Sequence, residues 1–201
     1  MTEQPLLPFD QSALLQEFDP DKRLDSFFDL LIAENQRVNL VSRETSRADF
    51  NRMVAECLLP LTVTGHDGRF GSYLDIGPGG GFPLVPLLLS GRVGAGWACE
   101  RTQKKATALT RILAGLGLSA TVISRTFEEA RFERQFALVT LRYIKLTSDL
   151  LEKIFAVMPY TGLLIYYSQP EFAIKSLTAS PYRFQTSPEQ PIKSFTLIAP
   201  K

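Results

Sequence analysis

One eleven-residue stretch, residues 73–83, constrains the fold of this chain more than any other. It reads Tyr-Leu-Asp-Ile-Gly-Pro-Gly-Gly-Gly-Phe-Pro, so an apolar strand runs into an acidic residue, a glycine-rich turn and a proline that opens a helical pattern. Glycines accept positive φ angles and let a ligand approach the backbone, while the first N–H groups of a helix stay free for polar groups. This order predicts an α/β protein that holds a nucleoside-bearing ligand.

Short apolar runs alternate with helical periods after this stretch, which indicates βα repeats and a mostly parallel sheet. The pattern predicts strands over 72–76, 96–99, 121–124, 136–141 and 162–167, and helices over 82–90, 102–116 and 147–158. Gly117 is placed to end the middle helix. Two β-type runs, 182–186 and 194–199, predict a C-terminal antiparallel hairpin at the sheet edge. The expected fold class is α/β with a Rossmann-like sheet.

Two amphipathic helices are expected before the sheet. One follows the Asp19-Pro20-Asp21 start signal and carries Leu24, Phe27, Phe28, Leu31 and Ile32 on one face; the other runs from Phe50 to Leu61 and ends before a loop over 65–71. We expect a helical N-terminal extension over residues 1–68 and a sheet core over 69–201. Together they should form one compact unit, because 201 residues are too few for two full domains.

Composition excludes several classes of protein. The 22 Lys and Arg against 21 Asp and Glu give a net charge of +1, so any RNA contact must come from a local patch. No apolar run approaches the roughly 18 residues of a membrane span, and the first ten residues do not resemble a signal peptide. We expect a cytoplasmic protein with no membrane partner. Cys57, Cys99 and the single histidine, His66 in a solvated loop, predict no disulfide and no metal site.

The charge of Asp75 decides which cofactor the glycine loop suits. A dinucleotide fingerprint needs a third glycine where Phe82 stands. A carboxylate beside a pyrophosphate would repel it, whereas beside an ammonium or a sulfonium it attracts, so the loop favours S-adenosylmethionine. The alternative is a plain βα turn, which needs only one or two glycines. The candidate cofactor residues of this segment are Asp75, Gly77, Gly79, Gly80, Gly81 and Phe82.

Three further candidates follow the next strands. Glu100 ends the second strand, where a doubly wound fold places the carboxylate that binds ribose hydroxyls. Thr126, Phe127 and Glu128 follow the third strand and are placed to contact adenine, or alternatively to begin a helix. Arg142 follows the fourth strand, beside Tyr143, and is placed to bind phosphate or a base, unless the segment is simply a solvated basic loop.

The order of these pieces resembles the RsmG/GidB family, the guanine-N7 methyltransferases of small-subunit ribosomal RNA. The resemblance runs from about residue 24 to 199 and depends on four segments: 35–41 (Asn-Gln-Arg-Val-Asn-Leu-Val), 74–83, Glu100 with Lys104, and 125–129. It implies a Rossmann-like class I methyltransferase fold with a helical N-terminal extension, S-adenosylmethionine as cofactor, and ribosomal RNA or the small subunit as partner. We expect Arg142 to be the catalytic, substrate-side residue and also to contribute to cofactor binding.

The chain departs from the family pattern on the substrate side. The family shows a histidine and an aspartate between Arg52 and Leu61, where this chain has Glu-Cys-Leu-Leu-Pro at 56–60. It shows Ser-Arg-Ala where 141–143 read Leu-Arg-Tyr, and a lysine and a glycine where Tyr167 and Ser168 stand. These departures spare the cofactor loop and put the RNA target in question.

Guanine N7 already carries an unprotonated lone pair, so methyl transfer to it needs no general base, and alignment of donor and acceptor supplies the catalysis. This fits a chain without a recognisable triad. Three alternatives remain at this stage: an S-adenosylmethionine enzyme for a small molecule or protein, a noncatalytic RNA- or ribosome-binding homologue, and an NAD-dependent dehydrogenase. The sequence leaves the oligomeric state open, with a monomer favoured.

Overall fold

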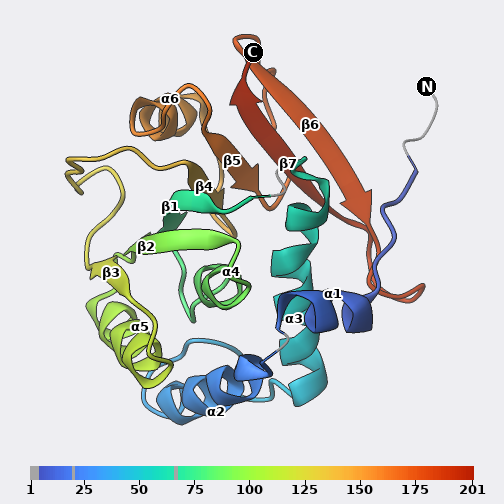
Figure 1. Ribbon diagram of the computed structural model, residues 1–201, viewed down its shortest axis with the longest axis vertical. Helices are drawn as coiled ribbons and strands as arrows, with labels where there is room; N and C mark the ends of the chain where they lie inside the picture. The colour runs from blue at the N-terminus through green and yellow to red at the C-terminus, as the bar shows by residue number, and fades with distance from the viewer. Residues whose placement is uncertain (1–4, 20, 66–67) are drawn as a thin grey trace.

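The computed structural model describes residues 5–19, 21–65 and 68–201, and it contains a seven-stranded sheet with helices on both faces (Figure 1). The sheet order is β3-β2-β1-β4-β5-β7-β6. The strands are β1 (Phe70–Ile76), β2 (Val93–Cys99), β3 (Ala120–Ile123), β4 (Leu138–Leu141), β5 (Leu163–Tyr166), β6 (Leu177–Phe184) and β7 (Lys193–Pro200). The helices are α1 (Gln11–Phe18), α2 (Arg23–Asn35), α3 (Arg47–Leu58), the 3₁₀ helix η1 (Leu59–Val63), α4 (Leu84–Leu89), α5 (Gln103–Gly115) and α6 (Ser148–Ala156).

The first five strands are parallel, and the last two form the predicted antiparallel hairpin. β1 lies centrally between β2 and β4, with Asp75 opposite Ala98 on one side and Thr140 on the other. β7 pairs antiparallel with both β5 and β6. Its first residue, Lys193, therefore lies at the edge where the parallel strands end. The expected α/β fold with a C-terminal hairpin is confirmed.

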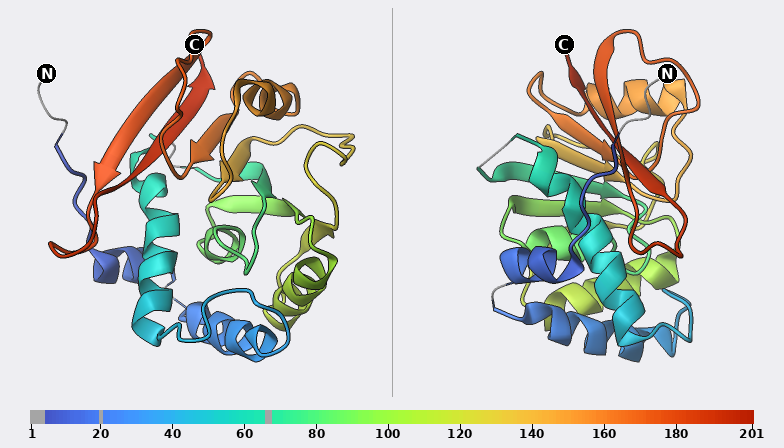
Figure 2. Two further views of the ribbon diagram at one scale, coloured as in Figure 1. Left: turned by 180° about the vertical axis from the view of Figure 1, so that it is seen from behind. Right: turned by 90° about the vertical axis from the view of Figure 1, so that its right-hand side faces the viewer.

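Helices cover both faces of the sheet (Figure 2), and two hydrophobic clusters hold them there. The larger cluster joins residues from the first five α-helices to one face, and includes Phe27, Phe50 and Phe82, whose rings lie 5.3 to 6.0 Å apart. The smaller cluster packs α6 and the segment before β4 on the other face. Because α2 and α3 contribute to the larger core, the N-terminal helices shape the rim of the sheet rather than standing apart.

Polar contacts fix α2 at both ends. The Asp19 carboxylate accepts hydrogen bonds from the backbone N–H groups of Arg23 (2.8 Å) and Leu24 (3.0 Å), so it satisfies the first two N–H groups of the helix from outside its Lys22 N-cap. Near the other end, Glu34 receives two hydrogen bonds from the guanidinium of Arg111 on α5, at 2.8 and 2.7 Å. Such a bidentate pair sets the position of α2 against α5.

Several boundaries differ from the sequence prediction. α1 was not predicted, since only Leu14 and Phe18 of its eight residues are buried and so short a pattern has little period. β1 begins inside the expected loop, because Phe70 pairs with Val93. α4 begins at Leu84, two residues later than predicted, and β6 begins at Leu177, five residues earlier. Gly117 ends α5 with a φ of 62°, as predicted. His66 lies outside the described residues.

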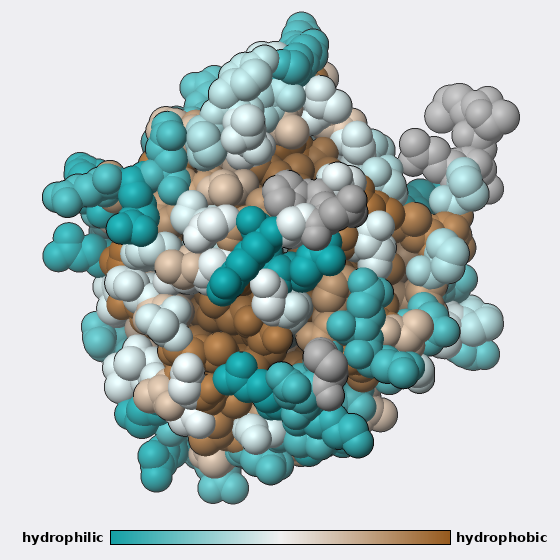
Figure 3. Space-filling view, in the orientation of Figure 1, coloured by the Kyte–Doolittle hydropathy of each residue, from teal (hydrophilic) through white to brown (hydrophobic). Residues whose placement is uncertain are grey.

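On the face that Figure 3 shows, hydrophilic side chains lie mainly at the periphery and apolar groups are visible between them near the middle. Large apolar side chains that are clearly exposed, among the residues described, are Leu6, Tyr143, Tyr160 and Ile192. In the same part of the chain no helix is long and apolar enough to cross a bilayer. Nor does any group of three His, Cys, Asp or Glu side chains within these residues form a candidate metal site.

Candidate cofactor site

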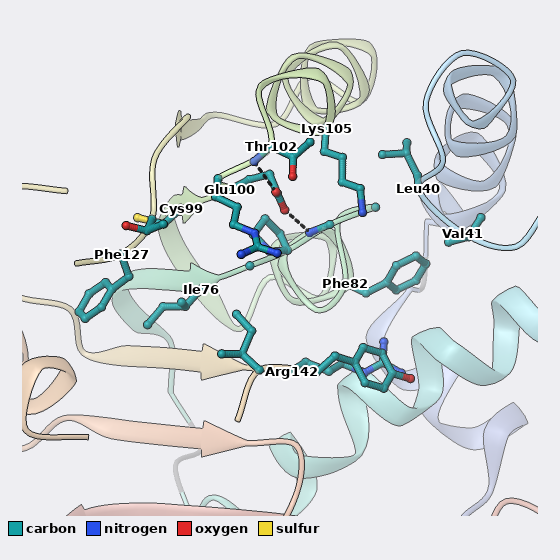
Figure 4. A pocket seen from close by; sticks show the side chains of 18 of the residues that line it. Leu40, Val41, Ile76, Phe82, Cys99, Glu100, Thr102, Lys105, Phe127 and Arg142 are labelled. Atoms are coloured by element: carbon teal, nitrogen blue, oxygen red, sulfur yellow. Dashed lines mark hydrogen bonds between the residues drawn. The ribbon is translucent and has the colours of Figure 1, made fainter. Parts of the chain in front are cut away.

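A cavity of about 650 Å³ opens where β1, β2, β3 and β4 end. This edge is where open α/β sheets bind their ligands. Figure 4 shows Ile76 and Phe127 on one side of the cavity, Leu40 and Val41 on the other, with Glu100 above and Arg142 below. The predicted residues that line it are Gly77, Gly79, Gly80, Phe82, Glu100, Thr126, Phe127, Glu128 and Arg142.

The glycine loop needs its glycines for different reasons. Gly77 has a φ of 74°, and its N–H donates to the Cys99 carbonyl at 2.9 Å, which ties the loop to the end of β2. A Cβ at Gly77 would lie 2.5 Å from Cδ1 of Ile144, another lining residue. Gly81 has a φ of 96° and packs under the loop, where a Cβ would lie 2.9 Å from Val85. Gly77 thus faces the cavity, whereas Gly81 serves the packing of α4.

Asp75 lies behind the loop rather than at the cavity. Its side chain is fully buried; one carboxylate oxygen accepts from the Leu84 N–H (2.9 Å) and the other from the Thr140 hydroxyl (2.8 Å). The Thr140 hydroxyl also bonds Tyr73 at 2.8 Å. Burial raises the pKa of Asp75 to about 7. We expected this carboxylate to face the ligand. Instead, both of its oxygens form hydrogen bonds inside the protein, one with the turn into α4 and one with β4.

Glu100 reaches the cavity from the end of β2 (Figure 4), and Glu128 is the other acidic residue of the lining. Its two oxygens accept hydrogen bonds from the backbone N–H groups of Gly79 (3.1 Å) and Thr102 (2.8 Å). The side chain therefore joins the glycine loop to the start of α5. Each carboxylate oxygen has a second lone pair, so the group remains able to accept hydroxyl donors from a ligand in the cavity.

The segment after β3 forms a turn beside the cavity, not the start of a helix. The backbone N–H of Thr126 donates to the Glu129 carboxylate at 3.1 Å, which is half of a capping box without a helix behind it. Phe127 is buried and stacks on Phe132, with ring centroids 5.9 Å apart. One apolar ring and a set of backbone groups thus border the same end of the cavity.

Arg142 is held almost completely out of solvent. Its guanidinium pairs with the Glu56 carboxylate of α3 at 3.2 Å and donates to the Tyr143 hydroxyl at 3.1 Å. The centroid of the Tyr143 ring lies 4.5 Å from the guanidinium carbon of Arg142. The backbone φ of Tyr143 is 59°, which is rare for a residue with a bulky side chain. Arg142 lies on the side of the cavity away from Glu100 (Figure 4), and Tyr143 lines the cavity next to it in the chain.

Sequence reasoning missed the wall made by the connection between α2 and α3. The buried side-chain oxygen of Asn35 accepts hydrogen bonds from the N–H groups of Leu40 (2.8 Å) and Val41 (3.0 Å), and both residues line the cavity. At Gly80 a Cβ would lie 3.2 Å from the Leu40 carbonyl oxygen, so a glycine lets the two loops approach. Asn35 begins the first segment of the resemblance, which was the available signal for this wall.

Comparison with known proteins gives the family. A family model described as rRNA small subunit methyltransferase G (GidB) matches residues 21–189. The chain belongs to this family. The match spans both the N-terminal helices and the sheet, so the GidB resemblance predicted from residues 24–199 is confirmed.

Curated relatives named ribosomal RNA small subunit methyltransferase G align with parts of the chain. The protein of Magnetococcus marinus is 30% identical over 115 residues, which cover 56% of this chain and 51% of that protein. That of Rhodopseudomonas palustris strain BisB18 is 32% identical over 149 residues, covering 70% and 62%. The chain thus spans about half the length of the curated relatives that it matches first.

Solved structures agree on the fold. An O-methyltransferase from Bacillus cereus, solved in complex with SAH, superposes with a TM-score of 0.64 at 14% identity, covering 88% of this chain and 91% of that one. A ribosomal protein L11 methylase from Lactobacillus delbrueckii gives a TM-score of 0.57 at 14% identity, covering 75% and 79%. At these identities the likeness establishes a class I methyltransferase fold for this chain.

Replacing Gly77 by alanine should impair ligand binding at the cavity. The added Cβ would clash with the Ile144 side chain, which lines the cavity and would have to move, and a positive φ costs about 1 kcal/mol for alanine. Gly117→Ala is the matched control, because Gly117 has a φ of 62° and nothing within 4 Å of the added Cβ. We expect both variants to lose similar stability in denaturant titrations, but only Gly77→Ala to lose affinity for S-adenosylhomocysteine. Equal affinities would contradict the assignment of Ile144 to the cavity wall.

The buried carboxyl of Asp75 should make stability depend on pH. Its native pKa of about 7 lies above the ordinary 3.8, so between these values the native state keeps a proton that the unfolded chain releases. Unfolding free energy should therefore fall as pH rises from about 4 to about 7, on the order of 4 kcal/mol for this group. Asp75→Asn has no such proton, so its stability curve should diverge from the wild type over this range. Parallel curves would show that the carboxyl titrates normally.

Proposed function

We propose that this chain is an S-adenosylmethionine-dependent methyltransferase that methylates N7 of a guanine in small-subunit ribosomal RNA. The observation that carries the proposal is the single cavity into which Gly77 after β1, Glu100 after β2 and Phe127 near β3 all open. Three successive strand ends thus present the groups that the methionine end, the ribose and the adenine of such a cofactor require. Membership of the GidB family supports ribosomal RNA as the substrate.

The cavity fits this cofactor by its donors and acceptors. Glu100 would accept hydrogen bonds from the ribose hydroxyls with its remaining lone pairs. Phe127 would pack on the adenine, while backbone groups of Thr126 and Glu128 bind its polar edge. Backbone groups of Gly77, Gly79 and Gly80, with Phe82 nearby, would contact the methionine end. Asp75 and Gly81 would act on the ligand through the loop that they shape.

In the proposed reaction the protein mainly has to align the methyl donor with the acceptor base, and no proton transfer is needed. When bound, the cofactor supplies a methyl group activated on a sulfonium. Arg142 and Tyr143 both border the cavity, Arg142 on the side away from Glu100 (Figure 4), and they would hold the acceptor base in line with that methyl. Correct placement of two reactants is worth up to about 7–11 kcal/mol of a barrier. Guanine N7 is unprotonated at neutral pH, which agrees with a cavity whose described lining contains no histidine.

Transfer of labelled methyl groups to ribosomal RNA is the direct test of this function. Purified protein should methylate 30S subunits or 16S ribosomal RNA from cells that lack this chain, and mass analysis should place the product on guanine N7. RNA from cells that retain the chain serves as the control, because its site is already occupied. Unchanged guanine methylation in the deleted strain would exclude the RNA substrate.

Replacing Glu100 by glutamine should weaken cofactor binding. The change removes the charge that accepts the ribose hydroxyls and leaves an amide N–H₂ facing either Gly79 or Thr102. We expect a loss of about 1–3 kcal/mol in S-adenosylhomocysteine affinity by calorimetry. Glu133→Gln, at an exposed position, is the control and should bind like the wild type. Wild-type affinity in Glu100→Gln would refute the proposed ribose contact.

A further inference from the structure

A second cavity, of about 290 Å³, adjoins the cofactor site on the side of the C-terminal hairpin. It shares two lining residues, Arg142 and Tyr143, with the first cavity. Its other walls come from α3, from the end of β5 and from the beginning of β7, which antiparallel pairing brings to this edge. The size is close to the lower end of small-ligand sites, roughly 300–1,000 Å³.

A buried ionic cluster forms part of this second cavity. One oxygen of the Glu56 carboxylate forms an ion pair with the Arg142 guanidinium at 3.2 Å. The other forms an ion pair with the Lys193 ammonium at 2.5 Å. The side chains of Glu56 and Arg142 are each 5% exposed, whereas that of Lys193 is 35% exposed. Removing such charges from water is expensive, and apolar residues of the same volume would often stabilise a fold equally well. Stability alone therefore does not account for the cluster, and all three of its residues line the cavity, where a ligand can reach Lys193.

The charges of this cluster select an anion. Two cations meet one carboxylate, which leaves a net positive charge beside the cavity. An ammonium has three N–H groups, and the bond to Glu56 uses one of them. Lys193 thus keeps donors available for a second acceptor while Glu56 fixes its position.

The shared wall offers an aromatic face. Tyr143 is 86% exposed. The backbone of the same residue is strained, because its φ is positive. Flat exposed rings bind unstacked bases, and the Tyr143 ring borders both cavities. A base held there would lie beside the cofactor, and its phosphate would reach the second cavity.

We infer that the second cavity is the subsite for the target nucleotide, in which Tyr143 stacks on the base and Lys193, positioned by Glu56, binds the phosphate. This inference rests on the proposed function for its choice of a nucleotide. Lys193 is then a binding residue contributed by the C-terminal hairpin, and the hairpin is part of the substrate site.

Binding of GMP and of guanosine to the protein loaded with S-adenosylhomocysteine tests this subsite without turnover. Chemical-shift titrations should show GMP binding more tightly than guanosine to the wild type. Lys193→Gln should weaken the binding of GMP by roughly tenfold, because it removes one charge-assisted contact. The affinity for guanosine should stay unchanged. Lys193→Arg should retain GMP affinity within about threefold, because it keeps the charge.

Lys175→Gln is the matched control, since it removes an exposed lysine on the segment before β6, away from this cavity. It should bind GMP like the wild type, and every variant should bind S-adenosylhomocysteine equally. Equal affinity of wild type for GMP and guanosine, no GMP binding, or an unaffected Lys193→Gln would each overturn the subsite. If GMP binding depends on Lys193 but no ribosomal RNA is methylated, the proposed function fails and the nucleotide subsite stands.

Discussion

The hydrogen bonds of the Asp75 carboxylate are the contacts on which the site depends most. One oxygen holds the first N–H of α4 and the other holds the Thr140 hydroxyl of β4, at 2.9 and 2.8 Å. The first contact sets the turn that presents Gly77 to Gly80, and the second fixes β4 two residues before Arg142. Burying this carboxyl is costly, as its raised pKa shows. One side chain thereby positions both the glycine loop and the end of β4, which leads to Arg142.

Residues that directly follow a parallel strand were predictable from sequence. The glycine loop after β1, Glu100 after β2 and Arg142 after β4 each lie within a residue or two of a strand end, and parallel strands end at one edge. Recognising the strands was therefore enough to bring these residues together. Phe127 was predicted for the same reason, although it lies four residues beyond β3. The C-terminal hairpin was predicted from its two β-type runs, and the structure confirms it.

The direction of a buried side chain was not predictable in the same way. Charge alone suggested that Asp75 faces the ligand, but a carboxylate at a strand end also meets the N–H groups of the helix that follows. In this chain the Asp75 carboxylate forms its hydrogen bonds with the Leu84 N–H and with the Thr140 hydroxyl. Glu56 and Lys193, which form an ion pair, lie 137 positions apart in the sequence. No local sequence pattern predicts such a pair. The Asn35 side chain, which shapes the loop carrying Leu40 and Val41, acts through contacts that only the folded chain displays.

The two adjoining cavities differ in how they are built. The first is bordered by the short glycine-rich segment, whose positive φ angles leave its sequence little freedom. The second is lined by side chains from α3, from the end of β5 and from β7, and four positions where the chain departs from the family pattern lie in its lining: Glu56, Tyr143, Tyr167 and Ser168. Tyr167 stands where the resemblance predicts a lysine, and its hydroxyl donates to the Cys57 carbonyl of α3 at 2.6 Å. Lys193 brings an ammonium to the same cavity from the neighbouring strand. A lysine therefore lines the cavity that Tyr167 and Ser168 border, although it comes from β7 and not from the end of β5.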